Sequence, residues 1–499
     1  MGPADGETWK PTSNPSVSFV WKNAGQEATQ IMYRYEAVVG QVQDWISTGV
    51  LKPGDRLLSI RDMSAKLGYS TVTVYQAYRM LEDDGTLESR SRSGFFVSIG
   101  AKPLAEFGKM RPDWGTGSVS QTGTVDVAPI SLPRDLDGFG ARTVSEDLLP
   151  LAELYRLLGK NLRQEACYRN SIPWNGLEAL RDVVARQIGD TSSRTHGRNI
   201  VITRGTCTAL QLTLNHLRKE KGKIIVETPM DSDWVFTVRA SGRELVEIYS
   251  HPRYGVDPEQ FQYLLEHNDV AACVLSPINH SPTGVSYSVD VAQRIVEAAT
   301  GRNVKIIENM AGRDLYYTAP PAFDFAQFDT RNLVIRVGGF AETLGARFGL
   351  GWIVGSPRDL QDIRATVEAD VMLAGDWAIQ TTLAEFVVKR SYDRHLRKLR
   401  ETLSTRMRRG LSLMFQTFPD NCTVSRPHGG YVCWVRGPKE FDALNAAAKA
   451  RTNAVGFGPG PLFSVTRWFN NFIALNLSYE WTPQRERQLA LIGELLREH

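Results

Sequence analysis

Glu342 stands where the surrounding sequence would lead one to expect a catalytic lysine. It lies in the segment GGFAETLGARFGLGW, residues 338–352, in which glycines alternate with small and polar residues. A loop of this composition is typical of one that holds a cofactor over an active site. With an acid in the expected place of the lysine, the segment indicates an enzyme, an enzyme that has lost its reaction, or a fold retained for another purpose.

The cysteines and histidines give no sign of a metal site. The five cysteines form no C-x-x-C pair and the eight histidines show no H-x-x-x-H spacing, whereas a metal site needs several ligands close together. Neither a zinc site nor a disulfide framework is therefore expected, and scattered cysteines favour a reducing compartment.

The length and composition are those of a soluble protein with more than one domain. A chain of 499 residues predicts two or three domains, and 42% hydrophobic with 23% charged residues is ordinary for globular proteins. The net charge of +3 is too small to argue for a nucleic-acid partner by itself. The first residues lack the layout of a signal peptide, and no apolar run approaches the roughly 18 residues of a membrane span. We therefore expect a cytoplasmic protein without a membrane partner.

Shifts in composition and periodicity divide the chain into four regions. Residues 1–27 are polar and predict a flexible arm, whereas residues 28–98 carry three helical patterns followed by a short hairpin. Residues 99–127 are rich in Gly, Ser, Thr and Pro and predict a linker. In residues 128–499, β-branched runs alternate with helical patterns, which predicts α/β layers around a mostly parallel sheet and a smaller C-terminal α+β subdomain. The expected strands include NIVITRG, KIIVETP, AACVLSP, VKIIEN and NLVIRVGG.

The segment LGYSTVTVYQAYRMLEDDG, residues 67–85, has the pattern of a helix-turn-helix. A turn containing glycine precedes Ser70, whose hydroxyl can cap the second helix. The early residues of that helix are small or polar and would face the major groove of DNA. They are Thr71, Thr73, Tyr75 and Gln76.

The hairpin ESRSRSGFF adds two basic side chains to this pattern. Arg90 and Arg92 stand beside Gly94 and would form a wing that approaches phosphates or a minor groove. The alternative is a small helical interaction domain. The intact order of helix, turn, helix and wing favours DNA binding.

Residues 48–97 closely resemble the winged-helix domain of GntR-type bacterial regulators. The stretch GDRLLSIRDMS corresponds to that family's GdrLPSsRelA. Leu58 replaces the usual proline, and Thr71 stands where an arginine is common, so the operator bases are expected to differ from those typical of the family. The resemblance implies DNA contacts from Arg61, Ser70, Thr71 and Thr73, with Gly94 as the wing glycine.

The rest of the chain resembles a fold-type I aminotransferase, and the order of the fusion resembles the MocR-type branch of GntR regulators. Matching segments include VITRGTCTALQLTL, LSPINHSPTG, IIENMAGRDLYY and PHGGYVCWV. In that family these segments surround pyridoxal phosphate (PLP), whose aldehyde needs a lysine amine. The family's SFSKtlaPGLRLGW aligns with GFAETLGARFGLGW, which implies that Glu342 occupies the lysine position. A carboxylate cannot form an imine.

Other family contacts with PLP are replaced as well. The resemblance places Asn309 where an aspartate supports the ring nitrogen, and Ser281 where an asparagine bonds the phenolic oxygen of the ring. The resemblance also implies that Gly339 and Ala341 replace two serines that bind the phosphate, and that Gly349 replaces an arginine that binds it. Loss of all these groups together is hard to reconcile with retained PLP chemistry.

The replacements change the charge expected in the pocket. Glu342 replaces a lysine, and Ala474 stands where the resemblance implies an arginine for the substrate carboxylate, so the pocket becomes more negative. Because a buried charge needs a partner, we expect a cationic or many-hydroxyl ligand, such as an amine or a rhizopine-like amino-polyol. The alternative is that Glu342 is a surface acid on a loop that has drifted. The predicted pocket comprises Thr206, Cys207, Asp231, Trp234, Asn279, Ser281, Asn309, Glu342 and Arg347.

Together these patterns predict a bacterial transcription regulator with no catalytic residue and a sensor that has lost PLP chemistry. The expected partners are double-stranded operator DNA, a small-molecule effector and a second copy of the chain. Three alternatives stay open. They are an active PLP enzyme that uses a lysine elsewhere, a sensor that holds PLP non-covalently through Arg347 and Trp234, and an architectural DNA-binding dimer without a ligand.

Overall fold

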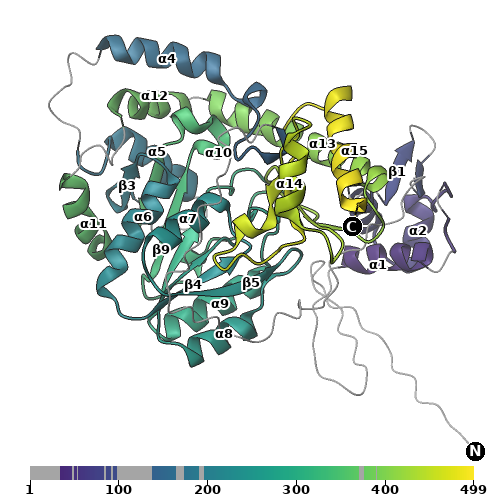
Figure 1. The fold of residues 1–499 in the computed structure, drawn as a ribbon, viewed down its shortest axis with the longest axis horizontal. Coiled ribbons are helices and arrows are strands. Elements are labelled where there is room, and N and C mark those ends of the chain that lie inside the picture. Colours follow the sequence, from purple (N-terminus) through teal and green to yellow (C-terminus); the bar gives the residue numbers. More distant parts are fainter. Residues whose placement is uncertain are drawn as a thin grey trace, which may run out of the picture. The chain divides into compact units, whose positions relative to one another are not determined.

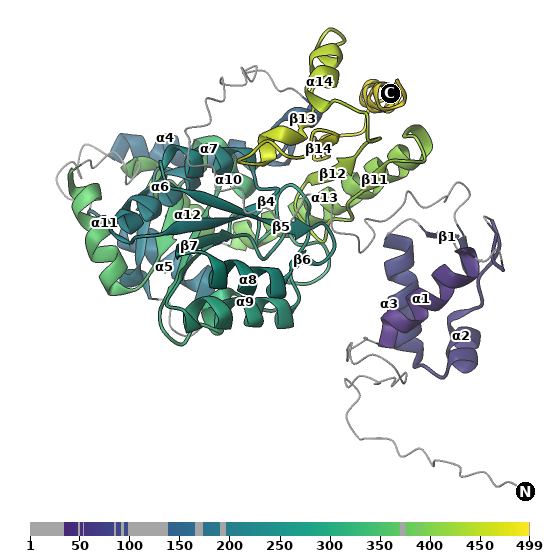
Figure 2. The same ribbon diagram turned by 60° about the horizontal axis from the view of Figure 1, so that its bottom comes forward.

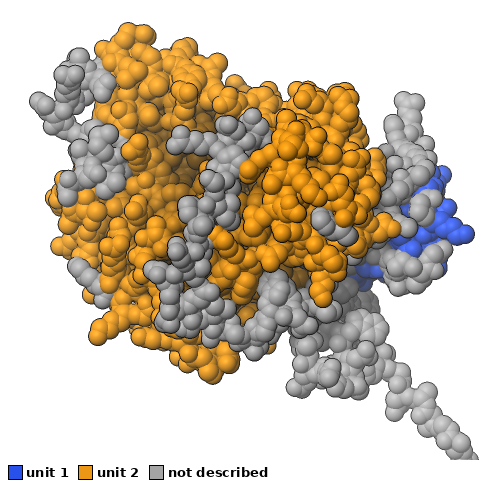
Figure 3. Space-filling view, in the orientation of Figure 1, with its two compact units in different colours: residues 1–103 blue, residues 104–499 orange. Residues whose placement is uncertain are grey.

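The computed structural model describes residues 34–47, 50–52, 54–83, 86–90, 94–97, 138–164, 173–189, 196–369, 376–388 and 390–498. The chain forms two compact units, residues 1–103 and 104–499, which are coloured separately in Figure 3. The division between them falls within the predicted linker at 99–127. That linker and the predicted arm at 1–27 lie outside the described residues.

The first unit contains the predicted three helices and hairpin. The helices are α1 (Arg34–Ser47), α2 (Ile60–Leu67) and α3 (Thr71–Asp83), and the strands β1 (Leu87–Arg90) and β2 (Gly94–Val97) pair antiparallel. Helix α2 ends where Gly68 adopts a φ of 72°, a left-handed conformation that glycine takes without steric cost.

The core of the first unit is apolar and draws on all of its elements. Val38 of α1, Met63 of α2, and Val74 and Tyr78 of α3 are fully buried, and Val97 of β2 packs with them. This core orients the opposite, exposed side of α3 toward solvent. The predicted winged helix-turn-helix is therefore confirmed.

The second unit is built on an eight-stranded sheet of order β3-β10-β9-β8-β7-β4-β5-β6. Adjacent strands from β9 through β5 are parallel, whereas β10 and β6 run antiparallel to their neighbours. The predicted mostly parallel sheet is thus present, and each quoted strand pattern forms a strand. The strands are β3 (Ile200–Thr203), β4 (Lys223–Thr228), β5 (Leu245–His251), β6 (Gly255–Val256), β7 (Val270–Leu275), β8 (Lys305–Asn309), β9 (Val334–Gly339) and β10 (Gly351–Val354).

Helices cover both faces of this sheet, because alternate side chains of each strand point to opposite faces. On β4, Val226 packs toward α6 (Thr206–His216), α7 (Ser232–Ala240) and α11 (Pro357–Ala369). Ile225 packs on the other face toward α8 (Pro258–His267) and α9 (Val289–Gly301), which lie side by side in Figures 1 and 2. On the same face as Ile225, side chains of β3 and β10 pack against α4 (Leu151–Gln164), α5 (Glu178–Gly189) and α12 (Trp377–Val388).

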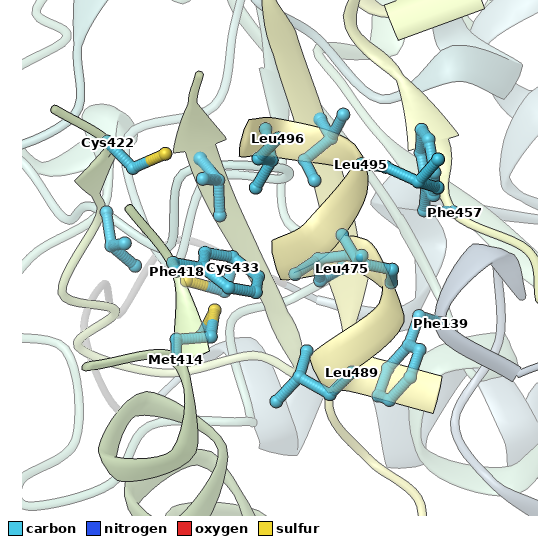
Figure 4. Packing of buried hydrophobic residues seen from close by; sticks show 14 of the residues in the cluster. Phe139, Met414, Phe418, Cys422, Cys433, Phe457, Leu475, Leu489, Leu495 and Leu496 are labelled. Atoms are coloured by element: carbon cyan, nitrogen blue, oxygen red, sulfur yellow. The ribbon is translucent and has the colours of Figure 1, made fainter. Parts of the chain in front are cut away.

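The C-terminal part forms the predicted smaller α+β subdomain. Its four-stranded antiparallel sheet has the order β11-β12-β14-β13. Figure 4 shows apolar side chains such as Phe418, Cys433, Leu475 and Leu489 packed between this sheet and its helices. The elements are α13 (Arg390–Thr417), β11 (Thr423–Val424), β12 (Val432–Arg436), α14 (Ala443–Arg451), β13 (Gly458–Pro459), β14 (Phe472–Asn476) and α15 (Pro483–Arg497).

Candidate functional site

A cavity of about 270 Å³ lies where the central strands of the large sheet end. Its walls come from the segments that follow β3, β4, β7, β8 and β9, joined by residues 429–432 at the start of β12. The carboxyl ends of parallel strands are the usual place for a ligand in a sheet of this kind. The fold therefore gathers side chains that are far apart in the sequence.

Most of the predicted pocket residues line this cavity, but Arg347 does not. Arg347 lies in the short 3-10 helix η7 (Ala346–Phe348), where its side chain is exposed. The cavity also has lining residues that the sequence prediction did not select, among them Arg204, Asp233 and Tyr431. The predicted residues that do line the cavity are Thr206, Cys207, Asp231, Trp234, Asn279, Ser281, Asn309 and Glu342.

Glu342 takes part in a hydrogen-bonded chain at one end of the cavity. It lies in α10 (Ala341–Leu344), just after β9, and its Oε2 is 2.6 Å from Tyr431 Oη. The same hydroxyl is 2.9 Å from the carbonyl oxygen of Arg142. Because Tyr431 has one proton to donate, both contacts are satisfied when Glu342 is protonated and donates to the tyrosine.

The environment of Glu342 favours that protonated form. The pKa of the Glu342 carboxyl is raised to about 7: burial is the largest cause, the hydrogen bond with Tyr431 opposes it, and the nearby Asp231 and Asp233 add to the rise. Glu342 is thus a partly buried acid whose charge changes near neutral pH.

Asp231 and Asp233 form the acidic wall next to Glu342. Asp231 caps α7, its Oδ1 accepting from the backbone N–H of Asp233 at 2.9 Å, and its Oδ2 accepts from Ser281 Oγ at 3.3 Å. Burial first, and then Asp233, raise the pKa of Asp231 to about 6. The carboxylate of Asp233 pairs with the guanidinium of Arg142.

In the first unit, the predicted DNA contacts lie on α2, α3 and the hairpin. Arg61, Thr71 and Tyr75 are exposed. Ser70 has a second task, since its Oγ accepts from the Thr73 N–H at 3.1 Å and lies 2.8 Å from Thr73 Oγ1.

The wing is described in part. Gly94 begins β2 with a φ of 96°, and a Cβ added there would lie 3.7 Å from the guanidinium of Arg56, a basic residue that the sequence prediction did not select. Gln76 lies in α3 and Arg90 in β1, but their side chains are outside the described residues, as is the whole of Arg92.

Residues 156–470 match the family profile described as aminotransferase class I and II. This match spans more than half of the chain. The chain belongs to the class I and II aminotransferase family. Residues 34–97 match a second profile, described as bacterial regulatory proteins of the gntR family. The predicted MocR-type architecture, a GntR domain fused ahead of an aminotransferase domain, is confirmed.

Full-length relatives share this arrangement. The chain is 25% identical over 470 residues to the HTH-type transcriptional regulator YdcR of Escherichia coli, covering 94% of this chain and 100% of that one. It is also 25% identical over 509 residues to the HTH-type transcriptional regulator TauR of Rhodobacter capsulatus, covering 97% and 99% of the two chains. In fold, it resembles the α-aminoadipate aminotransferase LysN of Thermus thermophilus, with a TM-score of 0.67 and 20% identity over 72% of this chain and 92% of that one.

The aminotransferase-like cavity lacks the groups that PLP requires at its aldehyde and ring nitrogen. No lysine lines it. Asn309 is engaged by its own neighbours, because its Nδ2 donates to Ser276 Oγ at 3.1 Å and its Oδ1 accepts from the Ala311 N–H at 3.0 Å. An amide held in this way supplies no negative charge to a pyridine nitrogen.

The loop that would bind the phosphate of PLP is closed around small residues. A Cβ at Gly339 would collide with Thr206 Oγ1, and a Cβ at Gly349 would lie 2.8 Å from Ala341 Cβ. No serine or arginine side chain fits at these glycines without a shift of the loop. The residues present therefore do not match the family's PLP site, although Arg204 and the N-terminus of α6 still line the cavity.

The described part of the chain offers neither a membrane-spanning helix nor a cluster of metal ligands. None of its helices combines the length and the apolar character that a membrane crossing requires. Its His, Cys, Asp and Glu side chains do not gather into any group of three that could hold a metal ion.

Proposed function

We propose that this DNA-binding transcriptional regulator uses its aminotransferase-like domain to sense a small cationic ligand without PLP catalysis. The observation that carries the proposal is the acidic end of the cavity, where Asp231, Asp233 and Glu342 lie together. The GntR match of residues 34–97 and the regulator names of the full-length relatives support the role in transcription.

The charges of the cavity support an amine as the recognised group. Three carboxyl groups line it and Arg204 brings one positive charge. A buried carboxylate is costly unless a cation or several hydrogen bonds compensate it, so a ligand ammonium group would gain both charge and hydrogen-bond partners here. The hydroxyl groups of Thr206, Thr208 and Ser281 also line the cavity and suit an amino-polyol.

Loss of the PLP reaction is proposed from the same site. With Glu342 at the position that resembles the family lysine, the described residues of the lining offer no amine for the imine through which PLP is held. The cavity would then retain its place at the strand ends but bind a different ligand.

The proposed regulatory mechanism is a population shift in a homodimer. Operators of helix-turn-helix regulators are commonly paired half-sites that match the twofold symmetry of a dimer. A ligand that binds one dimer geometry more tightly shifts the equilibrium toward it and changes the spacing available to the winged helices. Sedimentation of the full chain at twice its mass of 55.7 kDa is expected, and a monomer at micromolar concentration would contradict the mechanism.

The test begins with an operator selected by the full-length protein from a library of random duplexes. Fluorescence anisotropy then measures its Kd at pH 8 with and without primary amines, amino-polyols, uncharged polyols and PLP. We expect a subset of the amines to change Kd by about fivefold or more, which corresponds to a coupling of about 1 kcal/mol. In Glu342→Gln that response should weaken, whereas Glu385→Gln on α12, a surface acid paired with Lys160, should keep it. A response to PLP alone would overturn the proposal.

A non-covalent PLP sensor is the second candidate function, and one observation favours it. Arg204, Thr206 and the N-terminal turn of α6 line the cavity and form an environment that suits an anionic phosphate. Trp234 also lines the cavity and offers an aromatic surface. In this case PLP, but not amines, would change operator affinity in the same anisotropy experiment.

A further inference from the structure

Arg142 places a cationic side chain of the protein itself at the acidic end of the cavity. Its guanidinium pairs with Asp233, a lining residue, although Arg142 is not itself part of the lining. Both partners are exposed to solvent, with side-chain exposures of 46% and 43%, so the pair stands at the edge of the cavity. Ion pairs of this exposure contribute little to stability and exchange readily for another cation.

The backbone at Arg142 is held independently of that ion pair. Asn476 Nδ2 donates to the carbonyl oxygens of Ala141 and Thr143, both at 2.8 Å, and the Arg142 carbonyl accepts from Tyr431. Three hydrogen bonds therefore fix the main chain while the guanidinium extends from it on a flexible stem. The side chain can leave Asp233 without any movement of the segment that carries it.

The acids at this end have unused capacity for a hydrogen-bond donor. Within the described residues, Glu342 Oε1 has no hydrogen-bond partner, and the one partner of its Oε2 is Tyr431 Oη at 2.6 Å. Asp231 Oδ2 has the long contact to Ser281 at 3.3 Å. An incoming ammonium or guanidinium group would therefore find acceptors besides the carboxylate that Arg142 now occupies.

We propose that Arg142 is an internal competitor for the ligand's cationic group, which must displace the arginine guanidinium from Asp233 in order to bind. This inference rests on the proposed function of the cavity as a ligand site and deepens it by naming a residue that determines specificity. An uncharged isostere of the ligand offers Asp233 no positive charge in exchange for the guanidinium, so it competes less well than a cation. Arg142 thus favours cationic ligands over neutral or weakly basic ones.

Chemical complementation of a truncated arginine tests this role without knowledge of the natural ligand. In full-length Arg142→Ala, methylguanidinium can take the place of the missing side chain, whereas N-methylurea has a similar shape but no charge. We expect methylguanidinium to bind the variant at least tenfold more tightly than it binds the natural protein, as measured by calorimetric titration at pH 8. N-methylurea should show no such gain.

Two further variants separate this role from a general effect of removing an arginine. Arg409→Ala removes a guanidinium of similar exposure, paired with Glu486 outside the cavity, and should gain no affinity for methylguanidinium. Adding Asp233→Asn to Arg142→Ala should abolish the gain. If Arg142→Ala does not fold, Arg142→Ser, which also removes the guanidinium and its stem, serves in the same titration.

The outcomes are distinct from those of the operator experiment. Equal binding of methylguanidinium to the natural protein and to a folded Arg142 variant would overturn the proposed competition. An amine response of operator binding could then still stand, because it does not depend on Arg142. Conversely, complementation without any amine response would support the competition and contradict the proposed sensing function.

Discussion

The raised pKa of Glu342 links the state of one buried carboxyl to the stability of the second unit. In the unfolded chain this group loses its proton near its ordinary pKa of 4.5, whereas in the fold it keeps the proton up to about pH 7, chiefly because of burial. Between these values the folded state binds more protons than the unfolded state, so a rise in pH lowers the stability. Above pH 7 the full loss of folding stability from this carboxyl is present.

Glu342→Gln is therefore expected to stabilise the protein, and more so at high pH. The amide keeps a hydrogen-bond partner for Tyr431 but carries no charge to be buried. From pH 5 to pH 8, the gain of the variant over the natural protein in free energy of unfolding should grow by about 1–2 kcal/mol. Urea unfolding of both proteins at the two pH values checks this, and a difference that does not change with pH would contradict the account of Glu342.

The sequence predicted most of the selected cavity side chains correctly, but not all of them. Eight of the nine predicted pocket residues line it because each lies at or after the carboxyl end of a strand that the sheet fixes. Arg347 was placed there by its nearness to Gly349, but the turn of η7 leaves its side chain exposed. Tyr431 and Arg142 were missed because each lies about 90 or more residues from its partner in the chain, and no local spacing connects them.

At the scale of elements, the hydroxyl of Ser70, just before α3, has two possible roles. Ser70 is a predicted DNA contact, yet its Oγ accepts from the Thr73 N–H and so caps the helix. A cap of this kind is worth about 1 kcal/mol.

The regular elements were predicted well from the sequence. Strands such as β4 and β7 are largely buried, and their runs of apolar and β-branched residues indicate that burial in the sequence itself.

Two substitutions at Ser70 distinguish the cap from the contact. Ser70→Ala removes the cap, and amide exchange within α3 should then accelerate by about fivefold, the equivalent of about 1 kcal/mol. Ser70→Asn keeps a capping oxygen and should leave that exchange nearly unchanged. Hydrogen-exchange mass spectrometry on peptides that cover Thr71–Asp83 of the full chain measures both, and faster exchange in neither variant would contradict the capping role.

At the scale of the whole molecule, a GntR domain and a class I and II aminotransferase domain share one chain, and we propose that the second has lost its cofactor. The test is an absorbance and binding titration of the purified full-length protein with PLP, with Glu342→Lys in parallel. We expect the natural protein to show neither an imine band nor saturable binding, because no lysine is among the described residues that line the cavity and the glycines at 339 and 349 leave no room for the family's serine and arginine side chains. Saturable, stoichiometric binding of PLP to the natural protein, with or without an imine band, would contradict it.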